Sequence, residues 1–477
     1  MVSVEKSGIP LRFRFSVQQG GIPLKTHTIR KHLGSTQIIA LGFLAIIFIG
    51  TFLLMLPISS ADGTPTSFLD SCFTSVSASC VTGLIVQDTA THWSTFGHVV
   101  ILLLIQVGGL GFMTMAILMS LLMRRSITPK ERMLLAMSYN VDSYDSIIVL
   151  VRRIATGTLA IEGIGAVILA FRFVPDFGWG NGIFKSVFHS VSAFCNAGFD
   201  IVGVGNPEIT SLSYYMTDPL INLTLALLIV IGGIGFLVWS DLVNFAKGGR
   251  HLSVYSRIVL IITGCLLLVG TVFFAVFEWK NPATLGSVSS PFGKLLVSFF
   301  QSSTWRTAGF ATMNNGDFTQ NSQVLGVLLM FIGGASGSTA GGIKVGTFGI
   351  FIVTVFCVTV GKKQTVILGR NISENSFVRA ASVICVQLVC LLAGVLIINA
   401  MTPENIMDVL YEATSAISTV GVTTGITGGL PAGAKVVLMF MMYFGRVGVL
   451  TITYALMNRQ GAFSPNVRYP DAKMPVG

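Results

Sequence analysis

The chain has 477 residues, of which 52% are hydrophobic and only 10% are charged, whereas an average soluble protein carries roughly a quarter of charged residues. This composition excludes an ordinary soluble globular protein. The formal net charge of +10 raises the question of nucleic acid, but the basic residues lie in short links between apolar segments, which disfavours nucleic-acid binding. The seven cysteines form no CxxC pair and the six histidines are dispersed, which favours buried thiols over a zinc-type site.

Residues 1–34 are polar and basic, and the first apolar run is too long for a cleavable signal peptide. We therefore expect a cytoplasmic N-terminal arm at 1–34. Apolar windows of about 20 residues, the length that spans a bilayer, then recur along the chain. One window contains Glu162 and Arg172, and another is interrupted by a glycine-rich stretch. We expect eight spans, at residues 38–58, 99–123, 154–174, 220–237, 258–277, 324–360, 381–400 and 436–457.

The distribution of charge predicts the orientation of these spans. If both termini and the links after the second, fourth and sixth spans are cytoplasmic, that side holds 22 of the 30 basic residues. Because an excess of Lys and Arg marks the cytoplasmic side, we expect a plasma-membrane protein with both termini inside. The opposite face carries twelve acidic residues, which either attract cations to the mouth of a pore or are ordinary solvated loop charges. They include Asp62, Asp70, Asp88, Asp200, Asp218 and Asp317.

Four semi-polar segments between the spans each end in a glycine followed by a hydrophobic residue. Their glycines lie 115, 111 and 112 residues apart, at Gly83, Gly198, Gly309 and Gly421. A second glycine signature follows each segment, and such a period marks a repeat architecture. We expect an all-α polytopic membrane protein with four helix–pore-loop–helix repeats around a pseudo-fourfold pore, comprising eight transmembrane helices and four half-inserted pore helices. The repeats are expected at 35–135, 136–250, 251–362 and 363–458, before a cytoplasmic tail at 459–477.

The four glycine turns suit a partly dehydrated monovalent cation. Rings of backbone carbonyls replace the water around such an ion without trapping it, and aiming successive carbonyls at one axis favours glycine. Non-helical backbone at membrane depth persists only where protein covers it or where it lines a wet cavity. The pore helices would direct the negative ends of their dipoles toward the ion. The candidate filter residues are Cys80, Val81, Thr82, Gly83, Cys195, Asn196, Ala197, Gly198, Arg306, Thr307, Ala308, Gly309, Ser418, Thr419, Val420 and Gly421.

These motifs resemble the Trk/Ktr/HKT superfamily of potassium transporters. The resemblance rests on residues 79–84, 106–113, 192–199, 306–310, 419–421 and 444–446, and it covers about residues 35–470. Within the superfamily the chain is most similar to the Ktr-type (KtrB-type) membrane subunits, because residues 1–34 contain no additional spans and residues 466–471 are Ktr-like. The resemblance implies a homodimer in the lipid bilayer, gated by a cytosolic octameric KtrA-type ring. No cofactor is implied in this chain; the nucleotide, ATP/ADP or a cyclic dinucleotide, is expected on the partner.

The resemblance also implies potassium-selective uptake, with K+ held by the filter carbonyls and a dependence on Na+ left open. The filter glycines of the superfamily correspond to the four glycines named above, and four glycines match its potassium-selective members. A serine at the first position would instead indicate sodium. Cys80 and Cys195 depart from the residues common at the start of the filter, but this changes little because carbonyls bind the ion.

The sixth span cannot form a regular helix. Six of the fourteen residues from 333 to 346 are glycine, and each costs about 1 kcal/mol in a helix relative to alanine. The alternative is a glycine-rich packing face, whereas a P-loop is excluded because Lys344 is followed by valine. In the superfamily this stretch is an intramembrane loop that blocks the passage below the filter and moves when the ring binds nucleotide. The candidate gate residues are Gly333, Gly334, Ala335, Ser336, Gly337, Ser338, Thr339, Ala340, Gly341, Gly342, Lys344 and Arg446.

Apart from Arg172, which the charge count assigns to the outer face, three charged residues remain inside the predicted spans. Arg446 stands where the other three repeats have glycine, and a buried cation in a membrane indicates function. We expect Arg446 to raise the barrier to cations and to hydrogen-bond the carbonyls of the gating loop. Lys344 is either a gate latch or an interfacial anchor. Glu162 is expected to pair with a polar neighbour or the backbone, and a place on the ion path is the less favoured alternative.

Two other classes of protein are alternatives to a pore. A proton- or sodium-coupled secondary transporter of another small solute would place ionisable residues on broken helices at the midplane, whereas this chain has four pore-like turns and three buried charges. A membrane enzyme is disfavoured because the spans contain no HExxH, no GxSxG and no paired histidine and carboxylate cluster.

Overall fold

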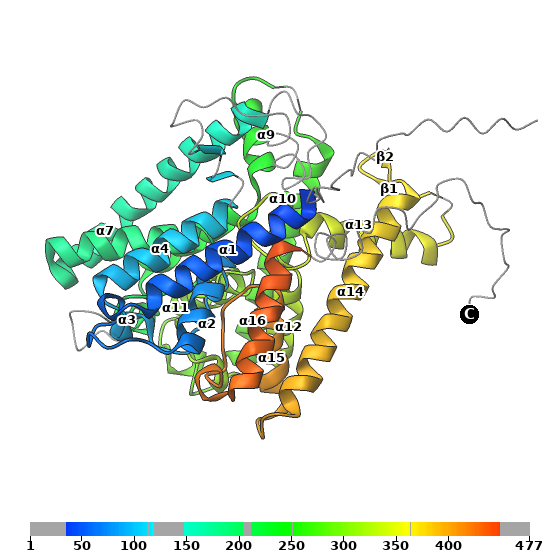
Figure 1. Cartoon of the computed structure of the whole chain (residues 1–477). Helices are drawn as coiled ribbons and strands as arrows, with labels where there is room; N and C mark the ends of the chain where they lie inside the picture. Colours follow the sequence, from blue (N-terminus) through cyan, green and yellow to red (C-terminus); the bar gives the residue numbers. More distant parts are fainter. Residues whose placement is uncertain are drawn as a thin grey trace, which may run out of the picture. The chain divides into compact units, whose positions relative to one another are not determined.

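The structure is a computed structural model that describes residues 35–111, 114, 115, 117, 118, 147–203, 211–249, 251–362 and 364–448. The predicted arm at 1–34 and tail at 459–477 lie outside the described residues. The described chain is almost entirely helical (Figure 1), which confirms the helical class. One small exception is a hairpin in the link before α14, formed by β1 (Val366–Ile367) and β2 (Arg370–Asn371).

Four of the described helices are long and apolar enough to cross a membrane. They are α1 (Ser35–Met55), α7 (Ile147–Phe194), α10 (Val254–Glu278) and α14 (Glu374–Asn399). Large apolar side chains, such as Phe52, Leu268 and Leu396, are exposed on their outer faces. A contiguous apolar exterior indicates contact with lipid rather than water.

In the first, second and fourth predicted repeats the second helix is shorter than expected, because it breaks at the second glycine signature. The helix α4 (Thr95–Leu110) ends at Gly111, where φ is 80°, and α16 (Ala432–Val447) ends at Gly448, where φ is 92°. Between α8 (Pro219–Gly233) and α9 (Phe236–Ala246) the chain bends by 98°, with φ of 90° at Gly235.

These breaks correct the prediction of continuous spans at 99–123, 220–237 and 436–457. A left-handed φ ends a helix, and glycine adopts it without a steric penalty. The remaining second helix is divided into α12 (Gln320–Phe331) and α13 (Val345–Thr359), so the interruption predicted in the sixth span is present.

A short helix precedes each of the four glycine turns. Three of them are separate helices with an N-terminal cap from Ser67, Ser290 or Asn405: α2 (Phe68–Ser79), α11 (Pro291–Thr304) and α15 (Ile406–Ile417). The fourth is the C-terminal part of α7, which a kink at Gly178 separates from the long N-terminal part. The helix α3 (Thr89–His92) follows the first turn.

The short helices pack within their own segments and against the next segment. The helix α2 packs on α1 and α4, α7 on α8, α11 on α10, and α15 on α14 and α16. Between segments, α4 contacts α7, α8 contacts α11, α12 contacts α15, and α16 contacts α2. These contacts connect the four segments into a closed cycle, with the glycine turns buried inside it.

Candidate functional site

The four glycine turns share one backbone conformation. The second residue of each turn has a left-handed φ, which is 56° at Val81, 58° at Asn196, 69° at Thr307 and 51° at Thr419. The fourth residue is again left-handed, with φ of 95° at Gly83, 70° at Gly198, 81° at Gly309 and 99° at Gly421. A left-handed non-glycine residue costs of the order of 1–3 kcal/mol, and such residues cluster at functional sites.

The four glycines lie against one another in cyclic order and are called the glycine ring below. A methyl group on Gly198 would lie 2.6 Å from the Ala308 carbonyl oxygen, and one on Gly309 would lie 2.6 Å from the Val420 carbonyl oxygen. Methyl groups on the other two glycines would collide with carbonyl oxygens in the same way, Gly83 with Ala197 and Gly421 with Thr82. Each glycine thus faces the carbonyl that precedes the next glycine, so the ring has no space for side chains.

Hydroxyl groups near the ends of the short helices hold the turns in place. Gly83 N donates to Ser77 Oγ at 3.0 Å, and Gly421 N donates to Ser415 Oγ at 2.9 Å. In the other two turns Ser192 Oγ accepts from Phe199 N at 3.0 Å, and Thr304 Oγ1 donates to the Phe310 carbonyl at 2.7 Å. These bonds fix the backbone without using charged groups.

The first residues of the turns do not share one environment. Cys80 and Cys195 are fully buried, and Cys195 Sγ donates to Gln106 Oε1 at 3.6 Å, behind the second turn. The Arg306 side chain leaves the third turn and bonds to carbonyl oxygens of other segments. The structure therefore brings the last two residues of each predicted filter set together, whereas the side chains of Cys195 and Arg306 contact groups outside the ring.

Residues 332–344, called the glycine-rich loop below, join α12 to α13 without helical structure. The two ends of the loop form a neck, since Gly333 N donates to the Ile343 carbonyl and Val345 N to the Gly334 carbonyl, both at 2.9 Å. Lys344 Nζ donates to the Ala340 carbonyl at 2.6 Å. This contact lies within the loop, and the choice between a gate latch and an interfacial anchor for Lys344 stays open.

The tip of the glycine-rich loop, residues 335–341, lies against the helix ends at the second and fourth turns. Ala335 N donates to the Gly233 carbonyl at 2.9 Å, and Thr339 Oγ1 donates to the Phe194 carbonyl at 3.1 Å. A methyl group on Gly341 would collide with the Thr419 side chain. The loop is therefore packed directly beside the turns.

Arg446 joins three segments at this point. Nη1 donates to the carbonyl of Thr339 on the loop, and Nη2 donates to the carbonyls of Gly108 and Gly109 at the end of α4, at 3.1 Å for Gly109. The predicted hydrogen bond between Arg446 and the loop is therefore present. Because charge-assisted hydrogen bonds are the stronger kind, Arg446 holds the loop against the first and fourth segments.

Glu162 and Glu412 are buried acids beside the turns. Glu162 Oε2 accepts from Gln106 Nε2 at 3.3 Å, as expected for pairing with a polar neighbour. Glu412, which sequence reasoning placed among the outer acids, is fully buried and accepts from Thr427 Oγ1 at 2.7 Å and Thr424 N at 3.0 Å. It braces the chain that leaves the fourth turn. The signal for this role was its position nine residues before Gly421, the same spacing as from His189 to Gly198.

Several of the predicted outer acids have structural partners, among them Asp88, Asp200 and Asp218. Asp88 caps α3, and Asp218 caps α8 and pairs with Arg172 at 2.9 Å. Asp200 Oδ1 lies 2.9 Å from His189 Nε2. Burial alone would raise the pKa of Asp200, but the hydrogen bonds with His189 and the amides of Val202 and Leu212 lower it below its usual value. Attraction of cations by the whole set stays a prediction.

Comparisons with known proteins agree on one family. The family model described as "TrkH: Cation transport protein" matches residues 14–464. The chain is 39% identical to the Ktr system potassium uptake protein B of Bacillus subtilis, over 92% of this chain and 96% of that protein. It is 37% identical to the potassium/sodium uptake protein NtpJ of Enterococcus hirae, over 94% and 98%. The crystal structure of the potassium transporter TrkH from Vibrio parahaemolyticus superposes with a TM-score of 0.68 at 21% identity, covering 91% of this chain and 86% of that one, which supports the fold.

Proposed function

Because the chain belongs to the TrkH family of cation transport proteins, we propose that it is the ion-translocating subunit of a potassium uptake system of the Ktr type. Membership makes it a multi-pass membrane transporter and not an enzyme. The substrate is proposed from the printed names of its relatives, which include potassium uptake proteins and one potassium/sodium uptake protein. A dependence on sodium therefore stays open.

The observation that carries this proposal is the cyclic contact of the glycine ring. Four turns with the same backbone place a carbonyl against each successive glycine, and converging carbonyls are the ligands that replace the water around K+. In this proposal the four segments are helix–pore-loop–helix repeats around a pseudo-fourfold pore. The last three residues of each predicted filter set, 81–83, 196–198, 307–309 and 419–421, form the selectivity filter.

The glycine-rich loop and Arg446 form the gate in this proposal. The loop is packed beside the second and fourth turns, and a guanidinium holds its tip. A fixed positive charge next to a cation pathway raises the barrier to a passing ion. Opening therefore requires the tip of the loop to break its hydrogen bond with Arg446 and to move out of the cation pathway.

The partners are proposed from the resemblance and from the Ktr-system names of the relatives. The protein would form a homodimer with both termini in the cytoplasm, and a cytosolic KtrA-type octameric ring would supply the nucleotide. The excess of basic residues in the predicted cytoplasmic links agrees with that orientation.

Growth rescue tests the proposed function. A cell that lacks its own potassium uptake systems is given the full-length protein, with and without a regulatory subunit, beside the Gly83→Ser variant. We expect the wild type to restore growth at low potassium, and we expect Gly83→Ser to admit more sodium because its side chain would displace the Ala197 carbonyl. Absence of rescue with either combination, for a protein inserted in the membrane at normal amounts, would refute the proposal.

A further inference from the structure

The side chain of Arg306 connects the third turn to the glycine-rich loop. The residue is 7% exposed, and its Nη2 donates to the Gly333 carbonyl at 3.0 Å. Its Nη1 donates to the carbonyl of Thr263 on α10 at 3.2 Å. The guanidinium therefore bridges a membrane-spanning helix and the first glycine of the loop, while its own backbone belongs to the turn.

The two arginines that bind the glycine-rich loop hold different parts of it. Arg306 contacts Gly333, which forms the neck through its hydrogen bond to Ile343. Arg446 contacts Thr339, which lies in the tip. Release of one contact therefore does not require release of the other.

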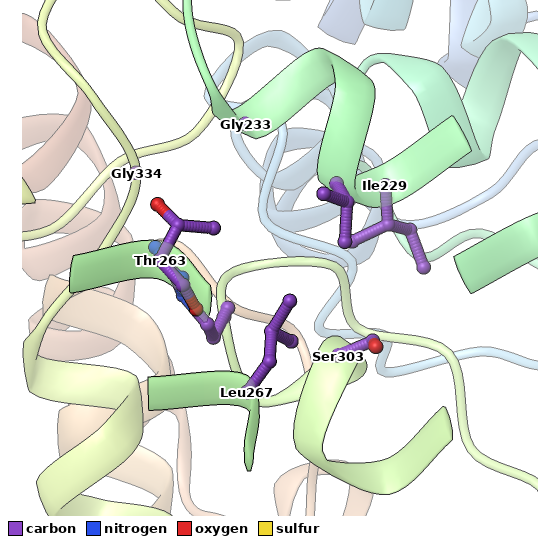
Figure 2. A pocket seen from close by; sticks show the side chains of 8 residues that line it. Ile229, Gly233, Thr263, Leu267, Ser303 and Gly334 are labelled. Carbon is purple, nitrogen blue, oxygen red and sulfur yellow. The ribbon is translucent and has the colours of Figure 1, made fainter. Parts of the chain in front are cut away.

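A small cavity lies beside the neck and the Arg306 side chain. Figure 2 shows this cavity between Ile229 of α8, Thr263 and Leu267 of α10, and Ser303 of α11, with Gly334 of the loop at its edge. Arg306 also lines the cavity. The hydrogen bond from Arg306 to the Gly333 carbonyl therefore links the third turn to the neck beside this cavity, in addition to the backbone hydrogen bonds that close the neck itself.

Burying the guanidinium of Arg306 at this place costs free energy. Among the described residues no carboxylate forms an ion pair with it, and its Nε has no hydrogen-bond partner there. A buried charge that only carbonyls compensate is a poor source of stability, and an ionisable residue inside a membrane protein indicates function.

We propose that Arg306 is a positioning residue that fixes the neck of the glycine-rich loop to the third turn, so that the tip moves during opening while the filter keeps its shape. This inference rests on the proposed function of the loop as a gate. Without Arg306 the neck and the turn would lose the side-chain hydrogen bond that links them. Gating and ion selectivity would then be disturbed together.

The test uses the full-length protein in liposomes without a regulatory partner, with K+ and Na+ fluxes measured separately. We expect Arg306→Gln to raise the K+ flux about tenfold, the effect of losing roughly one charge-assisted hydrogen bond, and to lower the K+/Na+ flux ratio. Arg306→Lys, whose ammonium lacks the guanidinium fork, should give intermediate values. Arg257→Gln, which removes an exposed arginine from α10, should match the wild type. Arg446→Gln should raise the flux at an unchanged ratio.

Wild-type flux and wild-type selectivity in Arg306→Gln, at equal amounts of folded protein by size-exclusion chromatography, would overturn the inference. If Arg306→Gln does not fold, the Arg306→Lys variant is the test. A higher K+ flux with a lower K+/Na+ flux ratio than in the wild type would support the inference, and wild-type values of both would overturn it. Failure of the proposed function would give a different pattern of K+ fluxes. In that case neither the wild type nor Arg446→Gln conducts K+, whatever residue stands at position 306.

Discussion

Replacing Gly309 by alanine tests the glycine ring most directly, because the collision it creates is defined by the structure. The new methyl group would lie 2.6 Å from the Val420 carbonyl oxygen, whereas nonbonded atoms prefer about 3.5 Å, so one turn must shift by roughly 0.9 Å. The φ of 81° adds a backbone cost of roughly 1–2 kcal/mol for alanine. We therefore expect a displaced filter carbonyl and a modest loss of stability.

We expect the K+/Na+ uptake ratio of Gly309→Ala to fall about tenfold, which corresponds to ~1.4 kcal/mol. This is close to the lower limit of roughly 1.5–3 kcal/mol for one contact between a charge and a polar partner. The assay is competitive K+ and Na+ uptake by the reconstituted protein, together with its thermal unfolding.

Gly63 provides the matched control for this substitution. Its φ is 71°, and nothing lies within 4 Å of a methyl group placed on it, so Gly63→Ala carries the backbone cost without the collision. We expect both variants to lose the stability that the backbone strain costs, Gly309→Ala to lose more because of the collision, and only Gly309→Ala to lose selectivity. Equal K+/Na+ ratios in the two variants would refute the reasoning that the ring is a carbonyl filter.

Three further predictions concern the charged groups beside the ring. Arg446→Gln removes the anchor of the loop tip, so the K+ flux without a partner should rise by roughly tenfold; an unchanged flux at normal surface expression would contradict the gate. Glu412→Ala leaves Thr424 N and Thr427 Oγ1 buried without their acceptor, which should cost about 2–3 kcal/mol and lower the midpoint of thermal unfolding, whereas an unchanged midpoint would remove its bracing role. Glu162→Gln keeps an acceptor for Gln106, so potassium uptake should stay within about twofold of the wild type; loss of uptake in a folded variant would instead place Glu162 on the ion path.

The helical class and the four turns were predictable because each has a local signal. The glycine period located Gly83, Gly198, Gly309 and Gly421, and the structure brings all four together. The interruption of the sixth span was also predictable, since many adjacent glycines are incompatible with a stable helix.

The breaks at Gly111, Gly235 and Gly448 were not predicted, although their signature was recognised. Hydropathy windows report composition, and a single glycine in an apolar run changes composition very little. The backbone angle at such a glycine depends on tertiary contacts, as at Gly235, where a methyl group would lie 3.0 Å from the Ser336 carbonyl. The directions of the Arg306 and Glu412 side chains depend on residues far away in the sequence, so no local pattern could reveal them.

The four turns belong to a single polypeptide, so the four segments need not be identical. A ring of four identical subunits would repeat every feature, placing four guanidiniums in mutual repulsion and four loops in competition for one space. Here the second glycine signature contains an arginine only in the fourth segment, at Arg446, and the glycine-rich loop occurs only in the third. If the loop is the gate, as proposed, one segment carries the obstruction and another carries its anchor, so opening would require one loop to move and not all four segments.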